Sequence, residues 1–188
     1  ENNIIGSSKS INIIKKNINK LSLTNARVLL SGEAGTGKKL IAKKIHQSSS
    51  RSEKPFISIN CSVLDNRNFD EQLFGNDSNN NKSLGYIQQA EGGTILLNEI
   101  CDMPYELQSK LTDFLQKETY SIKNENEKIY SNIRFISTTN KNPNNEIEEK
   151  KLKKDLYYRL NVAHIKVPTL NNRRDDIPIL IDFFIKKI

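Results

Sequence analysis

A glycine-rich turn that ends in a lysine carries the clearest chemistry in this chain. Residues 32–38 read Gly-Glu-Ala-Gly-Thr-Gly-Lys and fit the pattern G-x-x-x-x-G-K. Glycines let the backbone fold so that several N–H groups point into one cavity, and a following helix adds its positive end. The lysine supplies a full charge for the β- and γ-phosphates of a nucleotide. We therefore expect a phosphate-binding loop made of Gly32, Glu33, Ala34, Gly35, Thr36, Gly37 and Lys38.

The residues on either side of this turn suit such a loop, with one departure. An apolar run over 28–30 is typical of a buried strand, and apolar residues recur at helical spacing over 40–45. A plain strand-to-helix connection with a glycine turn is the alternative interpretation. Position 39, where a generic phosphate-binding loop has a Ser or Thr hydroxyl for Mg²⁺, is Lys39.

Polar residues also follow two other apolar runs. Asn98 and Glu99 come directly after the run 94–97, and Asn140 ends the run 133–140. Further strands are expected over 55–61 and 162–167. Strands that alternate with helices predict a parallel sheet of the α/β class, here with five strands, and ligands bind at the carboxyl ends of such strands. We therefore expect Lys38, Asn98, Glu99 and Asn140 to lie at one edge of the sheet.

The helices and connections between these strands are predicted from hydrophobic periodicity. Residues 8–21 form an amphipathic pattern, residues 84–90 are helical, and Pro104 begins a helix with its apolar residues on one side. We expect a surface loop with a short helix over 65–83, a β-hairpin over 119–131 with its turn near 124–126, and a charged stretch over 141–154. We assign 1–170 to the α/β core, and 171–188 to a linker and the start of a helical subdomain.

Composition bounds the class of protein. A length of 188 residues suits one α/β domain, and no apolar run reaches 18 residues, which favours a cytoplasmic protein without a membrane segment. Two cysteines and two isolated histidines match no metal or disulfide pattern. The net charge of +7 comes mainly from lysine, with 22 of the 29 basic residues, in a chain also rich in Asn and Ile. This pattern favours compositional drift over a nucleic-acid surface, so we expect DNA to be bound only by a domain outside this chain.

Taken in order, these segments resemble the AAA+ central domain of bacterial enhancer-binding proteins, the sigma-54-dependent activators of the nitrogen-regulation type. The resemblance runs from Ile4-Ile5-Gly6 to Asp176-Ile177-Pro178. Its most distinctive pieces are the Gly32–Lys38 loop, Asn60-Cys61, Gln72-Leu73-Phe74-Gly75, Gly92-Gly93-Thr94 with Asn98-Glu99-Ile100, and Asp155-Leu156-Tyr157-Tyr158-Arg159-Leu160-Asn161-Val162.

The resemblance implies a P-loop NTPase core that binds ATP or ADP between neighbouring subunits of a ring. The ring would be a hexamer or heptamer when active, and the isolated domain a dimer or a monomer. By the same resemblance, Ile4, Ile5 and Gly6 would line the adenine pocket. Glu99 would orient the attacking water, Asn60 would be the switch partner of Glu99, Asn140 would sense the γ-phosphate, and Arg159 would be a finger that reaches the neighbour's nucleotide.

The chain departs from the family pattern in four places. Only nine residues, 76–84, stand where the family has a longer loop with glycine, phenylalanine and threonine that touches sigma-54, and they contain neither Phe nor Thr. The Walker B aspartate is Asn98, the first of two arginine fingers is Lys153, and the usually acidic position 39 is Lys39. A lysine lacks the planar fork with which arginine binds phosphate oxygens.

Two of the four departures, Lys39 and Asn98, change the charge near the expected metal. The residues at 39, 98 and 99 are Lys, Asn and Glu, which are formally neutral together where the family carries three carboxylates. A unit charge about 5 Å from a dication, at an effective dielectric constant of about 20, is worth a few kcal/mol. We therefore expect weakened Mg²⁺ binding, with Asn98 reaching the ion only through water, and with Lys39 partly replacing the metal against the phosphates.

These features together predict a divergent AAA+ domain within a longer transcription regulator of the response-regulator type. We expect it to bind ATP, to hydrolyse ATP weakly or not at all, and to have lost the contact with sigma-54, while RNA polymerase stays a candidate partner. Two alternatives are open: an active ATPase that remodels the sigma-54 holoenzyme, and a scaffold that oligomerises without nucleotide.

Overall fold

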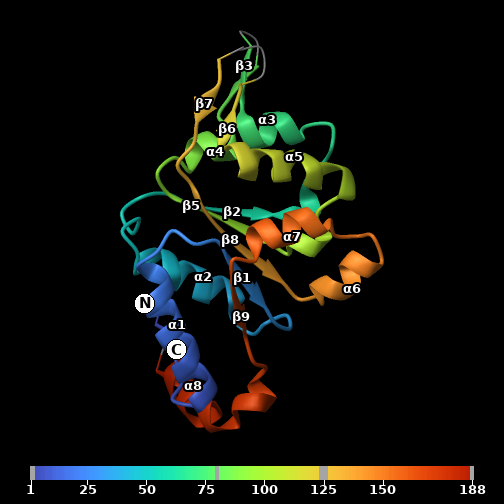
Figure 1. Cartoon of the computed structure of the whole chain (residues 1–188). Helices are drawn as coiled ribbons and strands as arrows, with labels where there is room; N and C mark the ends of the chain where they lie inside the picture. The colour runs from blue at the N-terminus through green and yellow to red at the C-terminus, as the bar shows by residue number, and fades with distance from the viewer. Residues whose placement is uncertain (1–2, 79–80, 123–126, 187–188) are drawn as a thin grey trace.

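Five parallel strands form the central sheet of the computed structural model, which describes residues 3–78, 81–122 and 127–186 (Figure 1). The strands lie in the order β2-β5-β8-β1-β9. Their bounds are β1 Val28–Ser31, β2 Phe56–Asn60, β5 Thr94–Asn98, β8 Arg134–Thr139 and β9 Ala163–Lys166. Each neighbouring pair is parallel, so all five carboxyl ends meet at one edge. The predicted five-stranded parallel sheet is confirmed.

Alternate residues of the strands pack into two separate cores, because successive side chains in a strand point to opposite faces. Ile95 and Leu97 belong to one apolar cluster, whereas Leu96 between them belongs to the other. The first cluster also holds apolar residues of α3, α5 and α7, and the second holds those of α1 and α2. The sheet is therefore covered on both faces, which explains why its strands read as continuous apolar runs.

The helices expected over 8–21, after the glycine-rich loop, over 84–90 and after Pro104 lie close to the predicted positions, whereas α6 and α7 were not predicted as helices. The α-helices are α1 Lys9–Ser22, α2 Lys38–Gln47, α3 Phe69–Phe74, α4 Tyr86–Gln89, α5 Tyr105–Lys117, α6 Pro143–Glu148, α7 Lys154–Leu160 and α8 Ile177–Ile185. Short 3-10 segments are η1 Cys61–Val63, η2 Ile100–Asp102 and η3 Leu170–Asp176. The amphipathic pattern of α1 buries Ile11, Ile14 and Ile18 against the sheet, as expected.

Two antiparallel strand pairs extend from the upper end of the molecule (Figure 1). The predicted hairpin over 119–131 is confirmed by β6 Thr119–Tyr120 and β7 Ile129–Tyr130, and its predicted turn lies outside the described residues. The sequence did not indicate the second pair, β3 Asn76–Ser78 and β4 Asn81–Ser83, because polar, Asn-rich segments carry no apolar alternation. This pair occupies the place of the shortened loop. The charged stretch 141–154 contains α6, which was also not predicted.

Two arginines that count toward the net charge are buried at the edge opposite the carboxyl ends of the strands. Arg51 donates to the carbonyl oxygens of Gly92, Gly93 and Asn132 at 2.9, 3.1 and 2.8 Å. Arg134, only 1% exposed, donates to carbonyl oxygens before β1, and burial together with the charge of Arg51 lowers its pKa to about 10. These two cations serve the fold, in agreement with the view that net charge alone indicates no nucleic-acid surface.

Within the described part of the chain, no helix has the length and apolar character needed to cross a bilayer.

Candidate nucleotide-binding site

The glycine-rich loop joins β1 to α2 and encloses the amino group of Lys38. Gly35 and Gly37 have φ values of +78° and +97°, in the left-handed region that favours glycine, and a Cβ at either would meet no atom within 4 Å. The loop is therefore open on the side where a ligand would lie. Lys38 is 7% exposed, and its Nζ donates to the carbonyl oxygens of Gly32 at 2.7 Å and Glu33 at 3.1 Å.

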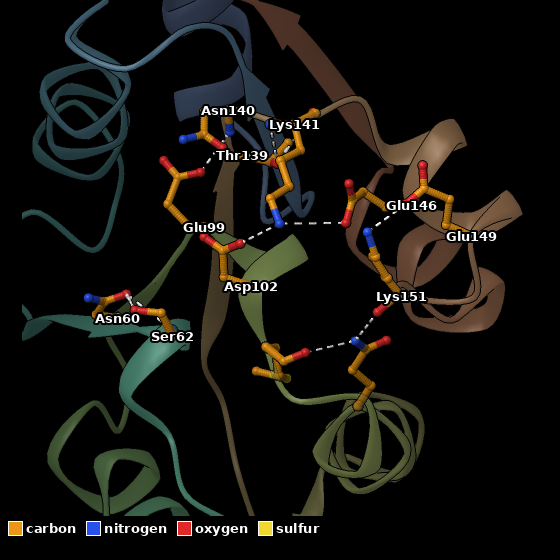
Figure 2. A network of polar contacts seen from close by, with 12 residues as sticks. Asn60, Ser62, Glu99, Asp102, Thr139, Asn140, Lys141, Glu146, Glu149 and Lys151 are labelled. Atoms are coloured by element: carbon orange, nitrogen blue, oxygen red, sulfur yellow. Dashed lines mark hydrogen bonds and ion pairs between the residues drawn. The ribbon is translucent and has the colours of Figure 1, made fainter.

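Glu99 lies at the centre of the polar edge of the sheet (Figure 2). Its carboxylate pairs with Lys38 Nζ at 3.5 Å and accepts a hydrogen bond from the backbone N–H of Asn140 at 2.7 Å. Its backbone has φ +52° and ψ +63°, an uncommon conformation for a residue with a side chain, and its N–H donates to Thr138 Oγ1 at 3.1 Å. The structure thus brings together Lys38, Glu99 and Asn140, and strain of this kind gathers at functional sites.

Asn98 and Asn60 stand opposite each other in the β2–β5 register, but each amide binds a serine. Asn98 Nδ2 donates to Ser58 Oγ at 2.6 Å. Asn60 Oδ1 accepts from the N–H and the hydroxyl of Ser62 at 3.2 and 3.0 Å, apart from Glu99 (Figure 2). The structure therefore places Asn60 at the carboxyl edge of the sheet, as expected, but Asn60 does not contact Glu99, the partner that the resemblance assigns to it.

The residues present do not fit a metal ion held by the protein. Lys39 is exposed at the position where a hydroxyl would bind Mg²⁺, and the nitrogen of the Asn98 amide is turned to Ser58. Among residues 3–78, 81–122 and 127–186, no group of three His, Cys, Asp or Glu side chains is placed to hold a metal. Next to Glu99, Asp102 is paired with Lys141 at 2.8 Å, and Lys141 also lies 3.7 Å from Glu146 (Figure 2).

An apolar pocket of about 350 Å³ opens beside the loop. Its walls come from three segments far apart in the sequence: the N-terminal residues Ile4 and Ile5, the loop with the start of α2, and α8 with the 3-10 segment before it. The lining residues are Asn3, Ile4, Ile5, Ile11, Gly35, Thr36, Gly37, Leu40, Ile41, Arg173, Leu180, Phe183 and Phe184. A pocket of this size and lining suits a nucleotide base next to the phosphate loop.

The N-terminal wall of this pocket is attached to the end of η3 by a buried carboxylate. Asp176, 0% exposed, accepts hydrogen bonds from Ser7 N at 2.6 Å, Ser8 N at 2.8 Å and Ser8 Oγ at 2.6 Å. Burial by itself raises the pKa of Asp176, but the hydrogen bonds from Ser8 and Ser7 and the charge of Arg173 lower it by more. Gly6 has no room for a side chain, since a Cβ there would lie 2.7 Å from this carboxylate. We call these contacts of Asp176 with Ser7 and Ser8 the clasp.

The side chains at the two finger positions contact α5. Arg159, on α7, donates to Gln116 Oε1 of α5 at 3.0 Å. Lys153 Nζ donates to Ser109 Oγ at 2.6 Å and lies 4.5 Å from the centre of the Tyr105 ring. Both side chains are thus held by residues of α5 in their own chain.

Sequence reasoning missed three residues that shape the site. Thr138 holds the backbone of Glu99, Arg173 lines the base pocket, and Asp176 forms the clasp. For Thr138 a signal existed, since it is the residue after Ser137, which pairs with Leu97, the residue before Asn98. For Arg173 and Asp176 the sequence held no local signal, because their partners are separated from them by 137 and 168 residues.

Comparison with known proteins agrees with this geometry. Residues 4–166 match the model of the sigma-54 interaction domain. The nitrogen assimilation regulatory protein NtrX of Azorhizobium caulinodans is 37% identical over 187 residues, covering 98% of this chain and 41% of that protein. The regulatory protein AtoC of Escherichia coli is 38% identical over 189 residues, covering 98% and 41%. The chain therefore spans about two fifths of the length of these curated relatives.

Solved structures give the same result. The crystal structure of NtrX from Brucella abortus in complex with ADP superposes with a TM-score of 0.93 at 33% identity, covering 100% of this chain and 43% of that one. The P-loop NTPase domain of an E. coli sigma-54 transport activator, at 23% identity and a TM-score of 0.60, shares the fold. The match over residues 4–166 and the P-loop geometry lead to one conclusion: this chain belongs to the sigma-54 interaction domain family and has the AAA+ P-loop NTPase fold.

Proposed function

We propose that this domain binds ATP or ADP at the glycine-rich loop, hydrolyses ATP weakly or not at all, and uses the nucleotide as a structural ligand that favours ring assembly. It would do so in the cytoplasm, as one part of a longer transcription regulator. The observation that carries the proposal is the arrangement of Lys38 between the loop carbonyls and Glu99, beside a pocket that fits a base.

Nucleotide binding is supported by the geometry of the glycine-rich loop and by the relatives. The loop is open where phosphates would lie, and the amino group of Lys38 is already held at its floor. Backbone N–H groups and the positive end of α2 favour an anion there. The NtrX protein of Brucella abortus was crystallised with ADP and with ATP.

Weak hydrolysis follows from the charges near the phosphates. The change to Lys39 and Asn98 leaves Glu99 as the carboxylate at this end of the site, and Glu99 is already paired with Lys38. A divalent cation near the phosphates would be bound less tightly by a few kcal/mol for each missing negative charge, at about 5 Å and an effective dielectric constant of about 20. Glu99 and Asn140 remain able to orient a water and to contact the terminal phosphate, which is why some activity is expected to survive.

Loss of the sigma-54 contact is proposed from the loop between Gly75 and Gly85. The short strands β3 and β4 stand there, and they are too few residues to carry the longer contact loop that the family resemblance implies. Ring assembly is proposed from the family resemblance, which makes Arg159 and the position of Lys153 contacts to a neighbouring subunit's nucleotide; in this chain both side chains contact α5.

Restoring the carboxylates tests the proposal. The double variant Asn98→Asp with Lys39→Glu should bind Mg²⁺-ATP more tightly and hydrolyse it measurably faster than the parent at high protein concentration. Lys153→Arg should add to this rate only once subunits assemble, because a finger acts across an interface. Steady-state phosphate release at increasing protein concentration measures both effects. Lys43→Glu, which changes the charge of another exposed residue of α2, is the matched control and should leave the rate unchanged.

The outcomes separate the alternatives. A parent that already turns over at about 1 s⁻¹ or more would favour the active ATPase, because that is an ordinary enzymatic rate. Calorimetry in which the parent and Lys38→Ala both fail to bind ATP would favour the scaffold that needs no nucleotide. Bound ATP with equal, negligible hydrolysis in every variant would place the defect in assembly.

A further inference from the structure

We infer that Arg173 is a nucleotide contact of this domain, and that its guanidinium binds the ribose and α-phosphate end of the bound ATP or ADP. The inference rests on the proposed nucleotide binding and adds to it a specific residue in the segment that precedes α8. Neither the loop motif nor the finger positions account for this residue.

Arg173 faces the base pocket next to the phosphate loop. It lines the pocket together with Gly35, Thr36 and Gly37, and its Nη2 donates to the carbonyl oxygen of Thr36 at 3.3 Å. Of the described residues that line this pocket, Arg173 alone carries a charge. The pocket therefore offers a nucleotide the charge of Arg173 in addition to that of Lys38 in the neighbouring loop.

The guanidinium is incompletely satisfied in the protein by itself. Its Nε is buried and has no hydrogen-bond partner among the described residues, and its bond to Thr36 is long. A buried donor without an acceptor is costly, and an anionic oxygen is the acceptor that a guanidinium binds best. The backbone of Arg173, with φ −144° and ψ +49°, departs from the helical values of η3, so a local break accompanies this placement.

The position of Arg173 along the nucleotide follows from its neighbours. The terminal phosphate is expected near Lys38, Glu99 and Asn140, and neither Glu99 nor Asn140 lines the pocket that Arg173 faces. In G-x-x-x-x-G-K loops the backbone N–H groups hold the α- and β-phosphates. A side chain that touches Thr36 from the base side is therefore close to the α-phosphate and the ribose, not to the γ-phosphate.

The same segment connects the two walls of the pocket. Three residues after Arg173, Asp176 holds Ser7 and Ser8, and hence the N-terminal segment 4–8, which carries Ile4 and Ile5 and which we call the strap. A nucleotide bound by Arg173 would thus engage the loop, the strap and the beginning of α8 through one short stretch of chain.

Nucleotide affinity of single variants tests the inference. Arg173→Gln should raise the Kd for ATP and for ADP by about tenfold each, as loss of one charge-assisted hydrogen bond implies. Arg173→Lys keeps the charge without the planar fork of the guanidinium, so its Kd should lie between those of the parent and of Arg173→Gln. Arg174→Gln is the matched control, because this neighbouring arginine is exposed and lies outside the lining of the base pocket. The Kd of the Arg174→Gln variant should stay within about twofold of the parent's. Titration calorimetry gives the Kd, and thermal melting without nucleotide reports folding.

Each result decides the point. Equal loss for ATP and ADP in Arg173→Gln, with a melting temperature like that of Arg174→Gln, supports the contact. A loss for ATP alone would overturn the α-phosphate assignment, and Kd values that match those of Arg174→Gln would overturn the contact itself. If Arg173→Gln melts early, the Arg173→Lys variant decides instead, by whether its ADP affinity falls. Failure of the parent to bind either nucleotide would refute the proposed function, which is a separate outcome.

Discussion

Replacing Asp176 by alanine should lower the free energy of unfolding by about 3–5 kcal/mol, which is large for one residue outside the two apolar clusters. The carboxylate is fully buried and accepts three short hydrogen bonds, from Ser7 N, Ser8 N and Ser8 Oγ at 2.6, 2.8 and 2.6 Å. In the alanine variant two backbone N–H groups at the start of α1 lose their acceptor, and the fold cannot close over the gap without moving the strap.

The magnitude follows from the type of bond. A hydrogen bond to a charged group contributes about 1.5–3 kcal/mol, so three bonds would reach about 4.5–9 kcal/mol if they were additive. Bonds to one carboxylate are not independent, and the burial of that charge offsets part of the gain. We therefore expect about three fifths of the additive sum, or about 3–5 kcal/mol. In a domain of this size, that loss corresponds to a fall in melting temperature of roughly 10 °C.

Urea unfolding of three variants measures the effect. Asp176→Ala should shift the midpoint to lower urea at an unchanged slope, since the surface exposed on unfolding stays the same. Asp176→Asn keeps one acceptor oxygen and should lose about 1–2 kcal/mol. Asp175→Ala, at an exposed neighbouring carboxylate, is the control and should stay within about 0.5 kcal/mol of the parent.

The pH dependence of the stability difference between the parent and Asp176→Ala provides an independent test. The pKa of Asp176 is lower in the folded protein than its ordinary value, so its contribution is fully present above the unfolded pKa of about 3.9. It is lost as the pH falls through the folded pKa. The difference between parent and Asp176→Ala should therefore be constant from about pH 7 to 5 and shrink below about pH 4. Equal stability of Asp176→Ala and Asp175→Ala, or a difference that grows in acid, would refute this reasoning.

Two further predictions concern catalysis and partner binding. Thr138→Val, in the Asn98→Asp/Lys39→Glu background, should lower ATP turnover about tenfold with ADP affinity unchanged, because the N–H of Glu99 loses its acceptor. Thr138→Ser keeps the hydroxyl and should keep the rate. Equal rates for the two variants would contradict the role of Thr138 in positioning Glu99. In a pull-down with a metal-fluoride mimic of the γ-phosphate, the parent should fail to retain sigma-54, and stable retention would contradict the proposed loss of contact.

The sequence predicted the elements whose pattern is local. The runs that became β1, β5 and β8 are buried on both faces, so they read as continuous apolar segments, and the helices that cover them show one apolar side. The polar residues at the strand ends were placed together because parallel strands share one carboxyl edge. The distances from Glu99 to Lys38 and to Asn140 N–H agree with that expectation.

The features that escaped prediction depend on partners far away in the chain or on polar backbone pairing. The β3–β4 pair lies in an Asn-rich segment where no apolar alternation marks a strand. The clasp joins residues 168 positions apart, and an Asp that precedes a helix is ordinarily read as a cap or a surface residue. The amide of Asn60, assigned to Glu99 by resemblance, binds Ser62, a competing partner only two residues away.

The arrangement of the base pocket explains how a nucleotide would act without being hydrolysed. Its walls are the strap near Ile4, the loop at 35–37 and α8 near Phe183. A bound nucleotide would add contacts to three segments that are otherwise joined by packing, by the clasp and by the hydrogen bond from Arg173 to Thr36. A ligand that binds only this arrangement stabilises it by about 2.7 kcal/mol at a concentration of 100 Kd. That effect needs the loop, Lys38 and the pocket, but it needs neither Asp at position 98 nor an acidic residue at 39. Under the proposed function, a domain with weak turnover and an intact pocket therefore still responds to ATP or ADP through the stability of its own fold. This response would be the same for both nucleotides wherever the γ-phosphate makes no contact of its own.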